Sequence, residues 1–127
     1  MSALSDIPNV EEEGLELGPV PGASGRYRFA GTGEAEGAAV LDRFLGQLHQ
    51  KALARQLREV TLELTELEFI NSSCLKAMVA WIYKVDTEGR PYTIRLLRDP
   101  ALHWQRTSLA TLQRLAPEVV SVEDRKK

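Results

Sequence analysis

The chain has 127 residues, of which 43% are hydrophobic and 27% are charged, and its net charge is −2. This length is enough for one domain, so we expect a single domain. Acidic and basic residues are interspersed along the chain, without the clustered basic face that nucleic-acid recognition needs, and this excludes a nucleic-acid-binding protein.

The sequence lacks the features that direct a chain into or across a membrane. No stretch approaches the roughly 20 apolar residues that span a bilayer, and the N-terminus has no basic segment followed by an apolar run. The one cysteine, Cys74, cannot form an internal disulfide and suits a reducing compartment. We therefore expect a cytoplasmic protein with no membrane contact.

The first third of the chain predicts a flexible end, a hairpin and a loop. Pro8 and the acidic run at 11–13 are typical of a flexible N-terminal segment, residues 1–13. Alternating apolar residues then predict two strands, at 15–17 and at 27–29. Residues 31–37 are rich in glycine, but the spacing does not match a nucleotide-binding loop, so we expect a flexible connection.

Helices and strands alternate through the rest of the chain. Apolar residues at helical spacing predict a helix from Ala38 to about Ala52. The next expected elements are a central strand with its alternating run at 60–65, a helix ending before Gly89, a strand at 92–97, a helix beginning at Asp99 and Pro100, and a strand at 119–122. The order ββαβαβαβ predicts an α/β fold with parallel crossovers and helices packed on the sheet. Residues 14–123 form the expected domain, and 124–127 form a charged tail.

The connection between the central strand and its helix is the candidate functional point. Asn71 is a favoured N-cap residue, which places Ser72, Ser73 and Cys74 in the first helical turn. Two neutral hydroxyl groups therefore lie where backbone N–H groups lack helical partners and where the helix dipole favours negative charge.

The segment VTLELTELEFINSSCL, residues 60–75, resembles the core of the STAS domain, the family of bacterial anti-sigma-factor antagonists and related signalling modules. The resemblance implies a STAS-like α/β fold with a mostly parallel or mixed central sheet. In antagonists of this family, the serine that matches Ser72 is phosphorylated by a kinase-type anti-sigma factor, and a serine phosphatase reverses the modification. Two positions differ, since Asn71 stands where the family commonly has aspartate and Cys74 stands where it has glycine.

The resemblance implies a non-enzymatic bacterial signalling module that binds a protein partner. Ser72 and the adjacent Ser73 are the candidate phosphorylation sites, because a phosphate adds about −1.5 to −2 charge to a neutral surface. The candidate partner-binding residues lie on one helix and the turn before it: Asn71, Ser72, Ser73, Cys74, Lys76 and Trp81. We expect no catalytic residues, metal or cofactor, and either a monomer or a homodimer.

Two other functions remain open. Cys74 in a first helical turn could be a nucleophile or redox sensor, although its helical spacing with Met78 and Trp81 favours a place in the core. The chain could also be a STAS scaffold that is never phosphorylated, and Ser72 and Ser73 would then only be small polar residues suited to a helix start.

Other polar residues have ordinary structural explanations. We expect His49 and His103 to be surface histidines, because neither has a second ligand at metal-binding spacing. Strand alternation places Glu66 and Glu68 on one side of the strand and Glu63 on the other. A solvent-exposed strand end explains these acids as well as a paired-acid hydrolase site does. Glu34 is expected to lie near the Asn71 turn, as the resemblance implies.

Overall fold

The computed structural model describes residues 7–125. Its elements are six strands and three helices: β1 (Val10–Glu12), β2 (Leu15–Pro19), β3 (Arg26–Gly33), α1 (Gly37–Ala54), β4 (Glu59–Ile70), α2 (Ser72–Thr87), β5 (Thr93–Arg98), α3 (His103–Leu115) and β6 (Val120–Asp124). Within this range no helix is long and apolar enough to cross a membrane.

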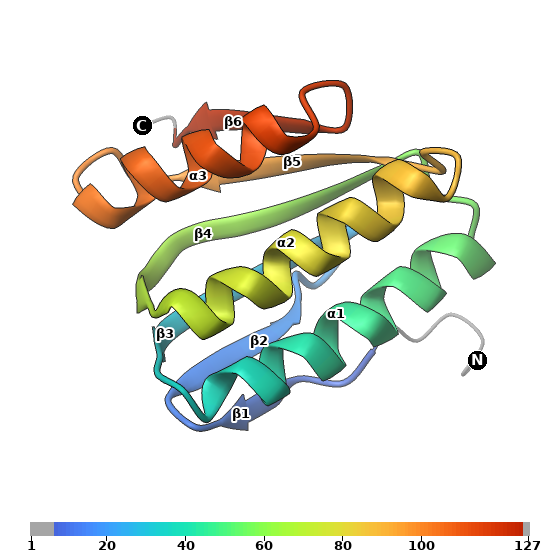
Figure 1. Cartoon of the computed structure of the whole chain (residues 1–127). Helices are drawn as coiled ribbons and strands as arrows, with labels where there is room; N and C mark the ends of the chain where they lie inside the picture. Colours follow the sequence, from blue (N-terminus) through green and yellow to red (C-terminus); the bar gives the residue numbers. More distant parts are fainter. Residues whose placement is uncertain (1–6, 126–127) are drawn as a thin grey trace.

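One mixed sheet organises the domain. The strands lie side by side in chain order, with β1, β2 and β3 antiparallel and β3, β4, β5 and β6 parallel. Each parallel connection contains one helix, and all three helices cover the same face of the sheet (Figure 1). Each connection leads to the next strand on the same side and crosses over with the same handedness, so every helix lies on the same face of the sheet. The predicted fold class, a single STAS-like α/β domain with a mixed sheet, is confirmed.

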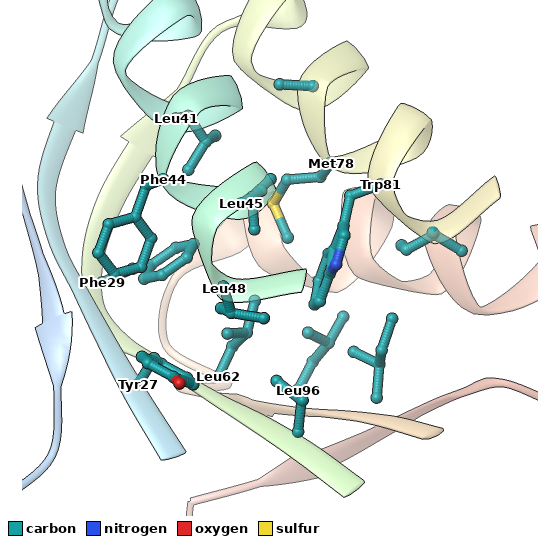
Figure 2. Packing of buried hydrophobic residues seen from close by; sticks show 14 of the residues in the cluster. Tyr27, Phe29, Leu41, Phe44, Leu45, Leu48, Leu62, Met78, Trp81 and Leu96 are labelled. Atoms are coloured by element: carbon teal, nitrogen blue, oxygen red, sulfur yellow. The ribbon is translucent and has the colours of Figure 1, made fainter. Parts of the chain in front are cut away.

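The core lies between the sheet and the helix layer (Figure 2). Tyr27 and Phe29 of β3 are fully buried, and each meets the ring of Phe44 on α1 edge to face, with centroids 6.1 and 5.6 Å apart. Alternate residues of β4 and β5, including Leu62 and Leu96, face the same layer at 0% exposure. The period-2 and helical patterns of the sequence therefore describe the core correctly.

In the described part of the chain, no helix covers the other face of the sheet (Figure 1), and charged side chains lie on it. Acids and bases alternate from strand to strand: Arg28 of β3 pairs with Glu16 of β2 and with Glu66 of β4. On the far side, Arg95 of β5 pairs with Glu123 of β6. Cross-strand ion pairs of this kind allow an uncovered sheet face to stay exposed to solvent. Because acids and bases are paired, neither sign of charge is in excess on this face.

Two predicted boundaries differ from the structure. Val10–Glu12, inside the segment expected to be flexible, form β1 and pair with β2, while residues 1–6 of that segment and 126–127 of the predicted tail lie outside the described residues. The prediction that Asp99 and Pro100 begin the last helix is wrong. The Asp99 carboxylate accepts a hydrogen bond from the Ala101 N–H in a separate turn, and α3 begins at His103.

Candidate functional site

The turn between β4 and α2 is built as the sequence predicts. The Asn71 side chain accepts a hydrogen bond from the Cys74 N–H at 3.0 Å, and the Leu75 N–H donates to the Asn71 carbonyl. The Asn71 N–H itself donates to the Gly33 carbonyl at 2.9 Å, which ties the turn to the end of β3. Asn71 is therefore the N-cap of α2, and Ser72 and Ser73 occupy the first two helical positions.

The two serines and Lys76 face solvent. All three side chains are exposed, and among residues 7–125 no hydrogen bond or ion pair holds them. We call Asn71, Ser72, Ser73 and Lys76 the turn surface. It offers two free hydroxyl groups and one free ammonium group at the exposed end of α2, a small patch on which a modification changes the charge without disturbing any internal contact.

Cys74 lies beneath the turn surface and not on it. Its side chain is fully buried, and its thiol donates a hydrogen bond to the Glu34 carbonyl at 3.3 Å. Burial raises the pKa of the Cys74 thiol above its ordinary value. A hydrogen bond from the Asn71 backbone opposes this pKa shift, and the negative charge of Glu34 adds to it. A buried, protonated thiol is neither a nucleophile nor an accessible redox sensor, so the geometry opposes the thiol-enzyme alternative.

The glycine-rich loop makes room for that thiol. A Cβ atom placed on Gly33 would lie 2.9 Å from the Cys74 sulfur, and one placed on Gly37 would lie 3.6 Å from it. The loop also carries Glu34 and Glu36, both exposed. The expectation that Glu34 lies near the turn agrees with its contact to Cys74. Close packing on α2 therefore accounts for the glycine at position 33, whereas a Cβ on Gly37 would lie closest to Leu15, at 3.1 Å.

Trp81, included in the predicted partner surface, is buried at 4% exposure. Its indole N–H donates to the hydroxyl oxygen of Tyr92 at 2.9 Å. A partner docking on the outside of α2 would not reach this indole, nor the thiol of Cys74, so these two residues can act only by supporting the helix. The exposed aromatic side chain on α2 is Tyr83, at 68% exposure, a residue that the sequence analysis did not select.

His49 is also buried, so the prediction of a surface histidine is wrong. It is 1% exposed, with Nδ1 2.7 Å from the Tyr92 hydroxyl and Nε2 3.1 Å from a carboxylate oxygen of Glu88. A signal was present in the sequence, because His49 follows Leu41 and Leu45 at spacings of four residues, on the buried stripe of α1. His103 is exposed, as expected.

The end of β4 is held by two side chains from α3. Gln105, fully buried, donates from its amide nitrogen to the carbonyls of Leu64 and Leu67, at 2.6 and 3.1 Å. The indole of Trp104 donates to the Leu67 carbonyl at 3.1 Å. Pairing with β5 stops at Glu63, so these donors replace strand partners along the last part of β4, which leads into the turn.

The acids of β4 do not form a hydrolytic pair. Between Arg28 and Ala30 of β3, β4 advances by three residues from Glu63 to Glu66, an irregularity that adds one residue to the strand. The extra residue places both acids on the open face, where Glu63 pairs with Arg26 and Glu66 pairs with Arg28. The prediction that Glu63 and Glu66 lie on opposite sides is therefore wrong.

The described part of the chain has no evident site for a metal ion. Within residues 7–125, no three His, Cys, Asp or Glu side chains gather closely enough to hold one. The turn surface itself contains hydroxyl, amide and ammonium groups, which are suited to hydrogen bonding and to modification and poorly suited to binding a cation.

The fold and the exposed turn define the class of structure, and comparison with known proteins gives its neighbours. No family model matches the chain, and no curated protein matches it by sequence. A chain in the crystal structure of the diguanylate cyclase SiaD in complex with its activator SiaC, from Pseudomonas aeruginosa, is similar with a TM-score of 0.67 and 13% identity, over 94% of this chain and all of that one. The structure of SiaC of Pseudomonas aeruginosa is similar with a TM-score of 0.50 and 19% identity, over 98% of both chains. These likenesses establish the fold.

Proposed function

We propose that this protein is a non-enzymatic signalling module that binds a regulatory protein through the turn surface, and that phosphorylation of Ser72 weakens the complex. The observation that carries the proposal is the pair of exposed, unpartnered hydroxyl groups at the start of α2. Further support comes from the neighbour SiaC, which is described as the activator of a diguanylate cyclase and forms a complex with it.

A phosphate on Ser72 would change binding without refolding the domain. Among residues 7–125, the Ser72 side chain makes no hydrogen bond or ion pair that modification would break, and the Asn71 cap depends on the Cys74 N–H and not on the serine. The modification adds about −1.5 to −2 charge at the centre of the proposed interface. A partner fitted to neutral hydroxyl groups would then have to desolvate this added charge on binding, which lowers affinity.

The resemblance to anti-sigma-factor antagonists supports a kinase-type anti-sigma factor as the partner and a serine phosphatase as the enzyme that reverses the switch. The likeness to the SiaC and SiaD complex supports a signalling enzyme as the bound protein instead. Both partners fit one proposal, a bacterial cytoplasmic module with residues 14–123 as its functional unit. Identifying the bound protein decides between an anti-sigma factor and a signalling enzyme.

The test combines detection of the modification with matched substitutions. The protein is purified from its host, phosphate is located by mass spectrometry, and binding to the co-purifying partner is measured for Ser72→Ala and Ser72→Asp. We expect Ser72→Asp to weaken binding at least tenfold and Ser72→Ala to preserve it. Ser24→Asp is the control, since Ser24 is exposed just before β3, at the opposite end of the sheet from the turn.

Equal affinity of Ser72→Ala and Ser72→Asp, with no phosphate on Ser72 or Ser73, would reject the switch. If a partner still bound in that case, the second candidate, an unphosphorylated STAS scaffold, would replace the first. The same exposed turn supports this candidate, because an exposed first helical turn needs no modification to serve as a contact surface.

A further inference from the structure

We infer that Lys76 is the intramolecular counter-ion of a phosphate carried on Ser72. The inference rests on the proposed function and deepens it by naming the residue that accommodates the modified state. Lys76 is exposed, and among the described residues it has no ion pair. It is also the only basic residue of α2 before Lys84.

Helix geometry brings the ammonium group of Lys76 over Ser72. Residues i and i+4 lie on one face, about 40° apart around the axis, and opposite charges at this spacing attract. Side chains on an α-helix lean toward its N-terminus, so the long Lys76 side chain extends back over the first turn. Nothing in the sequence of α2 competes for it nearby, because the first acid of the helix is Asp86.

The surrounding acids favour Ser72 over Ser73. The Cys74 thiol binds the Glu34 carbonyl, and the charge of Glu34 acts on that thiol, so the acidic loop lies on the Cys74 side of the helix. Ser72 projects about 160° away from Cys74 around the axis, whereas Ser73 projects only about 100° away. A phosphate on Ser73 would therefore lie closer to the loop carboxylates Glu34 and Glu36.

A titration of the phosphate tests the inference without a kinase. Phosphoserine is incorporated at position 72 during translation, and the second pKa of the phosphate, ordinarily about 6, is measured by ³¹P NMR. A nearby cation stabilises the dianion and lowers this pKa. We expect Lys76→Met to raise it by about 0.3 unit, which is the size of one i,i+4 ion pair, and Lys76→Arg to keep it low.

Two comparisons make the outcome decisive. Lys84→Met is the matched control, because Lys84 is exposed on the same helix but three turns from Ser72, and it should leave the pKa unchanged. Phosphoserine at position 73 should titrate at a higher pH than phosphoserine at position 72. Both serines occupy the same helix start, so the contribution of the helix dipole remains when only Lys76 is changed.

An unchanged phosphate pKa in Lys76→Met, with circular dichroism confirming the helix, would overturn the role of Lys76. This result is separate from failure of the proposed function. Absence of phosphate on the protein from its host would reject the switch, while the titration of the incorporated phosphoserine would still report whether Lys76 pairs with it.

Discussion

The Nδ1 atom of His49 lies 2.7 Å from the hydroxyl oxygen of Tyr92, and this contact joins α1 to the start of β5. The same oxygen accepts a hydrogen bond from the indole N–H of Trp81 on α2. Because an indole N–H can only donate, the Tyr92 hydroxyl oxygen accepts from Trp81 while it also contacts a ring nitrogen of His49, so this one hydroxyl group joins two helices. The other ring nitrogen of His49, Nε2, lies 3.1 Å from a carboxylate oxygen of Glu88, the residue just after α2.

Removing the Tyr92 hydroxyl should destabilise the fold. Tyr92→Phe leaves the buried indole N–H of Trp81 and the Nδ1 of His49 without partners, and each unsatisfied buried group costs about 1–3 kcal/mol. We expect the free energy of unfolding to fall by about 3 kcal/mol, measured by urea denaturation. The control is Tyr83→Phe, at an exposed position of α2, which should change it by less than about 0.5 kcal/mol. Equal losses in the two variants would show that the network contributes nothing.

The sequence predicts the core far better than it predicts such polar networks. Hydrophobic periodicity locates Leu62 and Met78 correctly, because apolar residues need only be buried, and spacing alone indicates which face is buried. The spacing of His49 with Leu41 and Leu45 indicates a buried position, but its hydrogen-bond partners Glu88 and Tyr92 lie 39 and 43 residues away. Local patterns carry no information about partners that distant.

In the candidate site too, local sequence patterns predict some features, while others depend on contacts with distant parts of the chain. The Asn71 cap and the first-turn serines follow from local chemistry, and the structure places them as predicted. The helical spacing of Cys74 with Met78 and Trp81 already favours the core, and the structure buries both Cys74 and Trp81, so neither belongs to the exposed partner surface. The extra residue in β4 that moves Glu66 to the open face likewise appears only when the strands pair.

Gln105 should matter for the shape of the candidate site as well as for stability. Gln105→Ala removes the donors to the Leu64 and Leu67 carbonyls, and it also removes the acceptor of the Asp99 N–H at 2.9 Å. We expect a loss of about 3 kcal/mol in the free energy of unfolding. Faster hydrogen exchange is expected at residues 66–72, because the end of β4 loses its anchor to α3.

Gln113→Ala provides the matched control for Gln105, since Gln113 is exposed on the same helix. It should leave both stability and exchange nearly unchanged. If Gln105→Ala destabilised the protein without any faster exchange at 66–72, the amide would support the core generally, and the idea that it holds the strand leading into the turn would be wrong.

The Cys74 thiol should be unreactive in the folded protein. Its pKa is raised chiefly by burial, so at neutral pH we expect very slow alkylation by iodoacetamide, becoming fast after denaturation in guanidinium chloride. The rate of alkylation is measured by mass spectrometry. Rapid alkylation of the folded protein would instead support the thiol-enzyme alternative.

The raised pKa of Cys74 also predicts how stability changes with pH. The folded state holds the thiol proton more tightly than the unfolded chain does, because burial disfavours the thiolate. The contribution of Cys74 is therefore fully present below the ordinary thiol pKa of about 8.5 and is lost as the pH rises toward the folded-state pKa. Urea denaturation between pH 8 and pH 10 should show this loss in the natural protein. The loss should be smaller in Cys74→Ala.

The close contact between Gly33 and Cys74 should appear as an energetic coupling. In Gly33→Ala the new Cβ would meet the Cys74 sulfur at 2.9 Å, with Ile70 and Leu15 at 3.2 and 3.4 Å, so we expect destabilisation by about 1–3 kcal/mol. Cys74→Ala removes the closest of these atoms, and adding it to Gly33→Ala should restore about 1 kcal/mol relative to additivity. Gly46→Ala is the control, because its Cβ meets nothing within 4 Å and alanine favours the helix. Strict additivity of the two changes would mean that the loop yields freely around the thiol. The glycines at 33–37 would then serve flexibility, and not the close packing that ties the loop to the start of α2.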